Sequence, residues 1–369
     1  MSVSLDLPKT QRAIVASDKL DYVIRDNVPL PPIMDDSVII KTEAVSLNPV
    51  DTKMVGPFVT PGAIYGTDAA GTVVAMGADV AASGRLKIGD RVCGATEGME
   101  GLRPQSGTFA EYVSLDGGMA LKMPEGMSFE IAAGMGLRIA TAGMAIFFSL
   151  GISPELLETP AEEPFDILVY GGATSTGTLA IQLLKRCGAR VITTCSPRNF
   201  DLVKSYGADV CFDYNSPKCG ADIRAFTGNA LDYALDCITE ESTMQICYQA
   251  LGRCGGKYVG LEPYPERTAN RKAVRPDWIL SSWMRGLPCS WPEPFGTKGM
   301  PDARDFAHSF FPKIHLMFTA GELKEHPTRV DPDGFEGLLD GVTLLRKGKV
   351  RGEKLVYRTA ERRAVTAAA

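Results

Sequence analysis

From residue 165 to about residue 261, short apolar runs alternate with amphipathic segments of helical length. The apolar runs read FDILVYGG, ARVITTC, DVCFDY, LDYALDCI and GKYVGL. Helices are expected between them, over TSTGTLAIQLLKRCG, over NFDLVKSYGA and from Glu240 to Leu251. Strands that alternate with helices form parallel βαβ units, so this half of the chain predicts an α/β fold with a doubly wound parallel sheet.

The residues before 140 have a different character. They contain the β-like runs SVIIKTEAV, AAGTVVAMG, DRVCGA and GTFAEYVSL, separated by Gly, Pro and Asp, which is typical of a small β-rich domain. Near the end, a helix and the β-like run GKVRGEKLVYR follow Gly334. Because single cores stop growing near ~250–300 residues, the length of 369 residues favours two domains. We expect a β-rich catalytic domain of residues 1–140, completed by residues 315–369, and a cofactor domain of residues 141–314.

The composition narrows the compartment and the partners. Lys and Arg total 39 against 44 Asp and Glu, a formal charge of -5, which argues against nucleic acid or an anionic membrane as a partner. No leader with a basic and an apolar region is visible, and the apolar run GMAIFFSLGI is shorter than the ~18 residues of a membrane span. Nine scattered cysteines without a C-x-x-C pair favour free thiols in a reducing compartment, so we expect a cytoplasmic protein.

The segment YGGATSTG, residues 170–177, joins an apolar strand to a helix, as in loops that bind the pyrophosphate of a dinucleotide at a helix N-terminus. Gly171 and Gly172 would form the tight turn, and Gly177 would let the helix pack closely on the sheet. Thr174 stands where the middle glycine of GxGxxG is expected, which weakens the motif unless the loop hydroxyls donate to phosphate. A plain strand-to-helix turn is the alternative interpretation.

The end of the next strand favours NADPH over NADH. An NAD site has an acidic residue about 20 residues further on, which binds the ribose hydroxyls. Here VITTC is followed by Ser196, Pro197, Arg198 and Asn199, and the first acid is Asp201. A hydroxyl and an arginine suit a 2′-phosphate, and Tyr214 at the end of the following strand can add a phenolic donor. Ser196 could equally be a helix N-cap.

The order of a β-rich domain, a nucleotide-binding domain and a returning tail resembles the medium-chain dehydrogenase/reductase superfamily, which joins a GroES-like domain to a Rossmann domain. In its zinc alcohol dehydrogenases, a Cys ends the strand that corresponds to EAVSL, and a GHE motif supplies a His. This chain has Asn48 at the first position, Thr67 and Asp68 in the second motif, and ATEGMEGLRPQSG in place of the four-cysteine zinc lobe. The histidines, His308, His315 and His326, come late and lack ligand spacing. Zinc needs three or four N or S ligands, so we expect no metal.

The zinc-free branch of that superfamily, similar to quinone oxidoreductases, reduces carbon–carbon double bonds conjugated to a carbonyl. Negative charge then develops on an enolate oxygen, which a nearby cation or hydroxyl stabilises in the transition state. Lys53 ends the loop SLNPVDTK and is placed for this role without a metal. The alternatives are that Lys53 is a surface lysine or only touches the cofactor.

A narrower resemblance covers nearly the whole chain. The segments NPVDTKM, YGTDAAGTVVAMG, TCSPRNFDLVKSYGA, LGRCGGKYVGLEP, PDWILSS and RKGKVRGEKLVYR are similar to the trans-acting enoyl reductases of fungal polyketide pathways. These stand-alone proteins serve an iterative polyketide synthase, or a polyketide synthase–peptide synthetase hybrid, whose own reductase domain is inactive. The resemblance implies NADPH-dependent reduction of an α,β-unsaturated thioester that is carried on an acyl carrier protein.

The same resemblance implies the site residues. Lys53 and Thr141 would be the catalytic candidates. NADPH would contact Val50, Asp51, Thr52, Lys53, Ala173, Thr174, Ser175, Thr176, Ser196, Pro197, Arg198, Asn199, Tyr214, Leu261, Glu262, Arg351 and Gly352. Substrate would lie along Ala142, Gly143, Met144, Ala145, Ile146, Phe147, Phe148 and Ser149, and along Ser282, Trp283, Met284, Arg285 and Gly286.

The residues themselves leave part of this open. The helix 142–149 is very apolar, which suits a polyketide chain but is more often a core helix. The segment DWILSSWMRGLPCSWPEPF places Trp278, Trp283, Trp291 and Phe295 among prolines, where we favour a substrate mouth over core packing.

Three functions remain in competition. They are the trans-acting enoyl reductase, a free-standing quinone or enone reductase, and a non-catalytic nucleotide-binding protein. A basic docking surface for an acidic carrier protein would favour the first, and Arg267, Arg271, Lys272 and Arg275 are its candidates, although a solvated surface run is the plainer interpretation. The Pro- and charge-rich segment after GKYVGLEP would blunt a sheet edge, so we expect a monomer.

Overall fold

The computed structural model describes residues 3–359, which form two compact units. Unit 1 takes in the described residues up to Leu137 together with those from Ser282 onward, and unit 2 extends from Arg138 to Ser281. Each unit is built around a separate β-sheet. The α/β class with a β-rich domain and a parallel-sheet domain is therefore confirmed.

The second boundary differs from the predicted one, which assigned residues 282–314 to the cofactor domain. In the structure these residues belong to unit 1. The reason is a set of ion pairs within that unit: Arg285 pairs with Glu97, and Arg304 pairs with Asp36 and Asp116.

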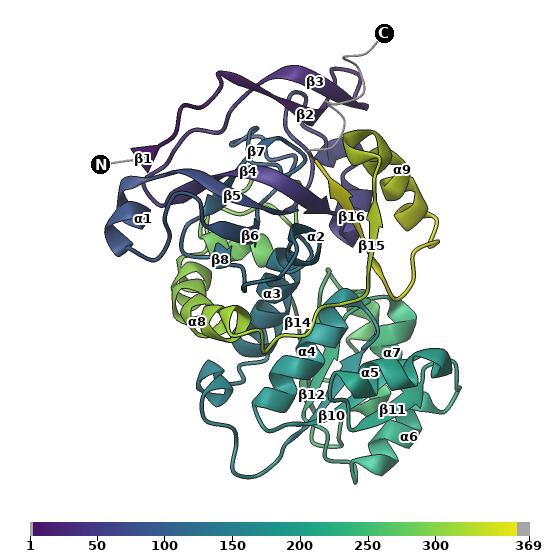
Figure 1. Ribbon diagram of the computed structural model, residues 1–369. Helices are drawn as coiled ribbons and strands as arrows, with labels where there is room; N and C mark the ends of the chain where they lie inside the picture. Colours follow the sequence, from purple (N-terminus) through teal and green to yellow (C-terminus); the bar gives the residue numbers. More distant parts are fainter. Residues whose placement is uncertain (1–2, 360–369) are drawn as a thin grey trace. The chain divides into compact units, whose positions relative to one another are not determined.

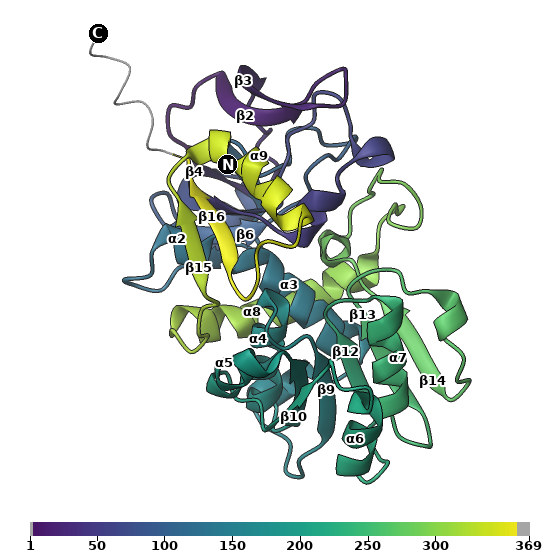
Figure 2. The same cartoon turned by 90° about the vertical axis from the view of Figure 1, so that its right-hand side faces the viewer.

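Unit 2 is a six-stranded, wholly parallel sheet with the strand order β11-β10-β9-β12-β13-β14. Its strands are β9 (Asp166–Tyr170), β10 (Arg190–Cys195), β11 (Val210–Asp213), β12 (Tyr233–Asp236), β13 (Gly256–Gly260) and β14 (Val274–Trp278). The helices are α4 (Ser175–Arg186), α5 (Phe200–Ser205), α6 (Cys219–Phe226) and α7 (Glu241–Ala250). Figure 2 shows α4 and α5 on one face of this sheet and α6 and α7 on the other.

The central strands of unit 2 are apolar because both of their faces are covered by helices. Ile167, Leu168 and Val169 of β9 are fully buried. The edge strand β14 is different: its sequence VRPDW alternates buried or half-buried with exposed residues, and Pro276 lacks the N–H group that a further strand would need.

Unit 1 contains a mixed eight-stranded sheet and a separate hairpin (Figure 1). The main sheet has the order β15-β16-β4-β5-β6-β8, with β1 beside β5 and β7 beside β4. Its strands are β1 (Val3–Ser4), β4 (Ser37–Ser46), β5 (Asp68–Met76), β6 (Arg91–Ala95), β7 (Tyr112–Asp116), β8 (Leu121–Lys122), β15 (Thr328–Asp331) and β16 (Lys354–Arg358), and the hairpin is β2 (Thr10–Ala16) with β3 (Tyr22–Pro29). The helices are α1 (Ala78–Ser83), α2 (Phe129–Ala132), α8 (Pro301–Thr319) and α9 (Gly334–Arg346).

The C-terminal tail returns to the sheet of unit 1. Strand β16 pairs antiparallel with β4, with Val356 opposite Ser46, and pairs parallel with β15. Helix α9 packs on the short 3-10 helix η1 (Pro49–Lys53), which follows β4. The tail thus reaches the loop that carries Lys53.

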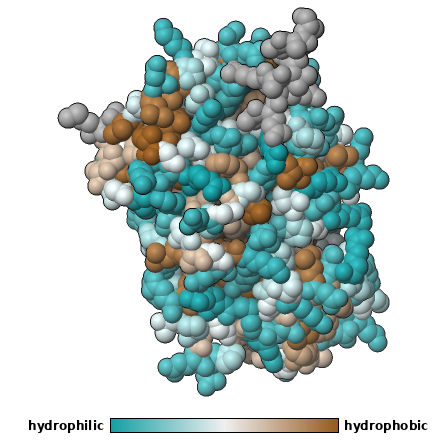
Figure 3. Space-filling model, in the orientation of Figure 1, coloured by the Kyte–Doolittle hydropathy of each residue, from teal (hydrophilic) through white to brown (hydrophobic). Residues whose placement is uncertain are grey.

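Apolar side chains gather on the surface of unit 1 near β1 (Figure 3). Val3, Leu5 and Met34 are 47%, 53% and 57% exposed. Exposed apolar areas often mark contacts with partners or ligands, and this one lies on a different element from the loop that carries Lys53.

One apolar stretch among the described residues has the length and composition of a membrane span. It is Phe129–Ser149, which comprises α2, α3 (Gly136–Gly143) and the π-helical turn η3 (Met144–Ser149). Of its most apolar window, 78% is buried within the protein. A core helix passes the same test, and the burial favours that interpretation.

Candidate active site

The candidate residues of unit 2 gather at one edge of its sheet. Residues 171–176 follow β9, residues 196–199 follow β10, Tyr214 follows β11, and residues 261–262 follow β13. All of these strands are parallel, so their carboxyl ends meet at the same edge. Ligands of open α/β sheets bind at this edge, next to the point where the strand order reverses. Here that point lies between β9 and β12.

The loop after β9 has the backbone geometry of a phosphate loop. Gly171 has a φ of +77°, which favours glycine, and a Cβ atom on Gly177 would lie 2.4 Å from the carbonyl oxygen of Gly171. Thr174 is the N-cap of α4, since its hydroxyl oxygen accepts a hydrogen bond from Gly177 N–H at 2.9 Å. Thr174 therefore has a structural reason to replace the glycine that GxGxxG would place there.

The other loop hydroxyls are placed at the start of α4. Ser175 Oγ is buried and has no hydrogen-bond partner among the described residues, and Ala173 and Thr176 are half-buried. A buried hydroxyl without a partner is costly, and the first N–H groups of a helix lack intrahelical partners. Both features fit a bound pyrophosphate, which would accept from these donors.

The residues predicted to choose between NADPH and NADH are brought together by two neighbouring strands. Cys195 at the end of β10 is in register with Asp213 at the end of β11. The hydroxyl groups of Ser196 and Tyr214 therefore lie 2.9 Å apart. The Ser196 side chain makes no capping hydrogen bond to the helical turn that follows it. Its hydroxyl contacts that of Tyr214 instead. Arg198 is exposed at the same edge, and Pro197 and Asn199 complete the turn.

Leu261 and Glu262 follow β13 and are half-buried. The Leu261 N–H group donates to Thr239 Oγ1 at 2.8 Å, which fixes the start of this loop. Its backbone is thus held at the carboxyl edge, as expected for a residue beside a cofactor.

The apolar helix predicted to line the substrate is largely core. Thr141 in α3 is half-buried. Beyond it, Ala142, Gly143, Met144, Ala145, Ile146 and Phe147 are all buried, with exposed fractions of at most 4% for those that have a side chain. The turn η3 packs on β13 and β14, and Ser149 Oγ donates to Asp277 Oδ2 at 2.5 Å. Only Phe148 and Ser149 of this set are half-buried, so core packing accounts for most of the helix, and its contact with substrate stays a prediction.

In unit 1, η1 presents Lys53 at its exposed end. Val50 and Thr52 are half-buried, and the carbonyl oxygen of Thr52 accepts a hydrogen bond from Arg346 at 3.1 Å. Asp51 is fully buried, and its side chain points into unit 1. The Asp51 carboxylate thus supports the loop from within, and the contact of Asp51 with the cofactor stays a prediction.

A buried polar network lies beneath η1. The N–H group of Asn48 donates to Asp51 Oδ2 at 2.7 Å, and Thr67 Oγ1 donates to Asp51 Oδ1 at 3.4 Å. The side-chain amide of Asn48 donates to Asp68 Oδ2 at 3.4 Å, and Lys354 Nζ donates to Asn48 Oδ1 at 2.5 Å. The Lys354 ammonium also lies 3.5 Å from Asp68 Oδ2. One lysine from the tail thus joins the end of β4 to the start of β5.

The Lys354 ammonium pairs with Asp68 and acts electrostatically on the buried Asp51 as well. Burial raises the pKa of Asp51 to about 7, although the Asn48 N–H group and the Lys354 ammonium act to lower it. Burial likewise raises the pKa of Asp68, and Lys354, the N–H group of Leu137 and Asn48 act in the opposite direction. Asp51, whose pKa lies near neutrality, therefore changes its charge in the working range of most enzymes.

Arg351 and Gly352 lie in the loop between α9 and β16. Arg351 is exposed, and its Nε atom donates to the carbonyl oxygen of Gly348 at 3.2 Å. Gly352 has a φ of +69°, which a side chain would strain. This loop runs directly into Lys354, so it is tied to the network beneath η1.

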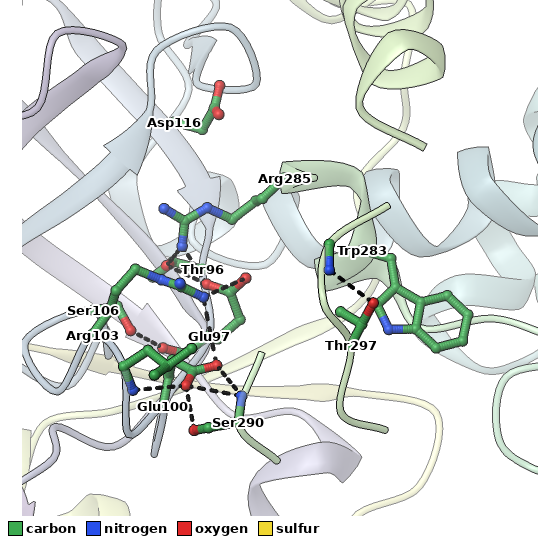
Figure 4. Close-up of polar contacts among 12 residues, drawn as sticks. Thr96, Glu97, Glu100, Arg103, Ser106, Asp116, Trp283, Arg285, Ser290 and Thr297 are labelled. Carbon is green, nitrogen blue, oxygen red and sulfur yellow. Dashed lines mark hydrogen bonds and ion pairs between the residues drawn. The ribbon is translucent and has the colours of Figure 1, made fainter. Parts of the chain in front are cut away.

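The second substrate segment, 282–286, is partly structural. Met284 is fully buried, and Arg285 pairs with Glu97 and donates to Thr96 Oγ1 at 3.0 Å (Figure 4). Burial acts to lower the pKa of Arg285, but Glu97 raises it overall, so the guanidinium stays charged. Gly286 has a φ of +68°. Arg285 thus has a structural role that fixes this segment. Ser282 and Trp283 are half-buried, and the contact of the segment with substrate stays a prediction.

The loop that replaces the four-cysteine lobe is held by buried glutamates. Glu100 is fully buried, and its carboxylate accepts from Ser290 Oγ at 2.5 Å and from Ser290 N–H at 3.1 Å (Figure 4). Burial alone would raise the pKa of Glu100, but these hydrogen bonds lower it. Arg103 lies 3.5 Å from Glu100 and 4.0 Å from Glu97. Ion pairs and hydrogen bonds thus fix a loop for which zinc relatives use a metal.

The aromatic segment is only partly a surface feature. Trp291 is 6% exposed and packs edge-on against Phe58, which corrects the prediction that it is an exposed mouth residue. Phe295 contacts Phe58 with ring centroids 5.4 Å apart, and Trp283 Nε1 donates to the carbonyl oxygen of Phe295 at 3.5 Å. Phe58, Trp283 and Phe295 are half-buried. Trp278, also half-buried, belongs to β14 in unit 2.

Comparison with known proteins agrees with this architecture. Residues 34–125 match the alcohol dehydrogenase GroES-like domain, and residues 175–270 match the zinc-binding dehydrogenase family. The trans-enoyl reductase buaC of Petromyces alliaceus is 50% identical over 357 residues, which cover 97% of this chain and 99% of buaC. The chain belongs to the trans-enoyl reductase family. The trans-enoyl reductase FSL5 of Gibberella zeae is 46% identical over 352 residues, 95% of this chain and 98% of FSL5. The family resemblance inferred from the sequence is confirmed.

A solved quinone oxidoreductase from Coxiella burnetii shares the fold of this family member. The TM-score is 0.66 at 24% identity, over 95% of this chain and all of that chain. At this identity, the likeness concerns the fold alone.

The residues of this family member do not fit a zinc ion at the position where zinc relatives bind one. The available groups there are the Asn48 amide, the Thr67 hydroxyl and the Asp68 carboxylate, and the Lys354 ammonium already binds among them. Across residues 3–359, no group of three His, Cys, Asp or Glu side chains is arranged to hold a metal. Zinc prefers softer N and S ligands than these.

The basic run proposed as a docking surface has structural duties in this trans-enoyl reductase family member. The Arg271 guanidinium donates to the carbonyl oxygens of Tyr248, Leu251 and Gly252, which caps the C-terminal end of α7. Arg267 pairs with Glu241 at the start of α7. Lys272 and Arg275 are exposed. Arg271 thus has a structural role, and the docking role of this run stays untested.

Sequence reasoning missed the buried network of Lys354, Asp68 and Asn48. Lysine is rarely buried, so its residue type pointed to the surface. A signal was present nonetheless: Lys354 starts the apolar strand KLVY, and Asn48 and Asp68 stand at the positions of the motifs that bind zinc in relatives.

Proposed function

We propose that this protein is a trans-acting enoyl reductase that uses NADPH to reduce the α,β-double bond of an enoyl thioester carried on an acyl carrier protein of a partner synthase. Family membership supports the reaction class. The observation that carries the assignment in the chain itself is Lys53. It stands exposed at the end of η1, on a loop anchored by buried groups at positions that would otherwise bind zinc.

The chemistry asks for a cation near the thioester oxygen. NADPH, when bound, supplies a hydride to the β-carbon. Negative charge then develops on the thioester oxygen, and a positioned ammonium stabilises it more in the transition state than in the ground state. Lys53 carries that charge in this proposal. Thr141, at the start of the apolar helix, is the second candidate, as a hydroxyl donor to the same oxygen or to the nicotinamide carboxamide.

The preference for NADPH follows from the edge of unit 2. Ser196 and Tyr214 hydroxyl groups lie side by side, and Arg198 is exposed on the same turn. A 2′-phosphate would accept from both hydroxyls and pair with the guanidinium. No carboxylate stands at residues 196–199 to bind a free 2′-hydroxyl. The loop after β9 and the N-terminus of α4 would hold the pyrophosphate.

The partner and the compartment are part of the proposal. The substrate would be a polyketide chain that grows on an iterative synthase or a synthase–peptide synthetase hybrid, and the enzyme would work in the cytoplasm. Pro276 and the exposed residues of the edge strand β14 support a monomer, because they leave this edge poorly suited to pairing with a second sheet.

The test is oxidation of NADPH in the presence of a 2-enoyl pantetheine thioester, run beside a simple quinone and with NADH as the control cofactor. The proposal expects fast oxidation with the thioester and NADPH, and little with the quinone. Turnover with quinone alone would assign a small-molecule reductase instead. Failure with both acceptors, repeated with enoyl chains loaded on a carrier protein, would refute the enzymatic assignment.

A further inference from the structure

The loop that carries Lys53 is supported by one buried cation from a distant part of the chain. Lys354 lies at the start of β16, 306 positions after Asn48, and its side chain is 5% exposed. Its ammonium binds Asn48, which begins η1, and Asp68, which begins β5. Burying an ammonium is expensive unless it is paired and hydrogen-bonded, so its placement there needs a reason.

We propose that Lys354 is a positioning residue for catalysis, whose ammonium, together with the carboxylate of Asp51, locks the η1 loop in the conformation that presents Lys53. The proposal rests on the proposed function for its catalytic consequence, and on the contacts beneath η1 for its structural one. No group in this network is proposed to touch the substrate.

The route from Lys354 to Lys53 is short and consists of direct contacts. Lys354 fixes the side chain of Asn48, and the backbone N–H of Asn48 holds the Asp51 carboxylate two residues before Lys53. The carbonyl oxygen of Asp51 accepts from Tyr65, and that of Met54 accepts from Tyr22 at 2.5 Å. Backbone groups on both sides of Lys53 are thus tied to the interior of unit 1.

The charge state of the network follows from the groups that face Asp51. They are Lys354 of β16, Asp68 of β5, Tyr65 just before β5 and Tyr22 of β3, and Arg346 of α9 acts on the two tyrosines. Burial raises the pKa of both tyrosines, so they stay protonated donors. Asp51 is the group that changes charge near neutral pH. When it is ionised, it is a full acceptor for Asn48 N–H and Thr67 and it attracts Lys354, which orders the loop although the burial of the charge lowers the stability of unit 1 as a whole. When it is protonated, the loop loses that attraction.

The experiment compares Lys354→Met and Lys354→Arg with wild type, and uses Lys122→Met as the matched control. Lys122 pairs with Asp90 in the same unit, on elements that do not carry η1. In Lys354→Met, turnover of the enoyl thioester should fall by about 10²-fold, because a displaced Lys53 no longer meets the oxygen. NADPH affinity, measured by fluorescence titration, should stay within about three-fold, and Lys354→Arg should recover most of the loss, since it restores a buried cation.

Two readouts separate positioning from a general loss of stability. Turnover of the wild type should rise with pH as Asp51 ionises. This rising part of the pH profile should be absent in Asp51→Asn. In Lys354→Met it should move to higher pH, because Lys354 lowers the pKa of Asp51. Hydrogen exchange of peptides spanning residues 46–55 should be faster in Lys354→Met and unchanged in Lys122→Met.

Several results would overturn the proposal. The proposal is wrong if Lys354→Met keeps wild-type turnover and wild-type hydrogen exchange in residues 46–55. It is also wrong if Lys354→Met and Lys122→Met lose turnover equally. If Lys354→Met does not fold, the pH dependence of turnover in Asp51→Asn is the deciding test. A rise of turnover with pH like that of the wild type would refute the role of the network. If the wild type reduces no thioester, the proposed function fails, while the exchange of residues 46–55 still tests the support of the loop.

Discussion

Replacing Asp51 by Asn should change how the stability of unit 1 depends on pH. Burial raises the pKa of Asp51 from its ordinary value of 3.8 to about 7 in the folded protein. At low pH the carboxyl group is neutral in the folded and the unfolded state, so its burial removes no charge from water and does not lower the free energy of unfolding. Between about pH 4 and 7 the unfolded chain releases a proton that the folded protein keeps, so stability falls as pH rises through the folded pKa.

The size of this loss follows from the two pKa values. The difference between 3.8 and about 7, at ~1.36 kcal/mol for each factor of ten, corresponds to roughly 4 kcal/mol once the pH exceeds the folded pKa. The amide introduced by Asp51→Asn would keep an acceptor for Asn48 N–H and would never carry the charge. Asp51→Asn should therefore be about as stable as the wild type near pH 4, and several kcal/mol more stable near pH 8.

The assay is urea unfolding of both proteins at a series of pH values, with fluorescence as the readout and NADPH absent. Asp90→Asn, which removes a buried carboxylate of the same unit that pairs with Lys122, is the control and should not reproduce the effect. Parallel stability curves for the wild type and Asp51→Asn between about pH 4 and 8 would refute the reasoning, because they would show that Asp51 does not titrate with a raised pKa.

The other predictions concern single contacts. Lys53→Ala should lower turnover by about 10²-fold or more while NADPH affinity stays within a few-fold; unchanged steady-state turnover would remove Lys53 from the mechanism. Arg198→Ala should weaken NADPH binding and leave NADH binding unchanged, because the partner of the 2′-phosphate is lost; equal effects in titrations of both cofactors would contradict the assignment. Glu97→Gln should cost ~3 kcal/mol or more in denaturant unfolding, because it leaves the Arg285 guanidinium buried without its charge partner; a cost near zero would show that water or another acceptor compensates Arg285.

The fold of unit 2 was readable from the sequence because its signals are local. Apolar runs of strand length alternate with amphipathic segments, and the helix expected from Glu240 to Leu251 is α7, Glu241–Ala250. Strand β14 was missed for the opposite reason. Its sequence VRPDW contains Pro276, which usually argues against a strand, and it forms only because β13 offers a free edge beside it.

In the candidate site, too, the features that follow from local sequence could be predicted, and those that depend on distant residues could not. Ser196 and Tyr214 could be placed at one edge from the sequence because each follows a strand, and parallel strands end at one edge; their hydroxyls lie 2.9 Å apart there. The burial of the Asp51 carboxylate was not predicted, because the direction of its side chain depends on Thr67, which is distant in sequence. Apolarity likewise could not tell whether Ile146 lines a channel or fills a core, since both need the same residue type.

The placement of Lys354 bears on which cation can do chemistry. Its ammonium is 5% exposed and is bound by the Asn48 side-chain oxygen and Asp68, so a substrate oxygen would have to displace one of these partners to reach it. A catalytic zinc ion keeps an open coordination site for substrate, whereas the Lys354 ammonium is buried between two protein partners. The electrophile must then come from a group that the network presents and does not enclose. On η1 that group is Lys53, exposed at the end of the helix whose start Lys354 fixes. Lys53→Met, which removes the exposed charge and leaves Lys354 in place, should thus lose turnover by about 10²-fold or more in steady-state assays, and turnover near the wild-type value would show that the buried ammonium substitutes for Lys53.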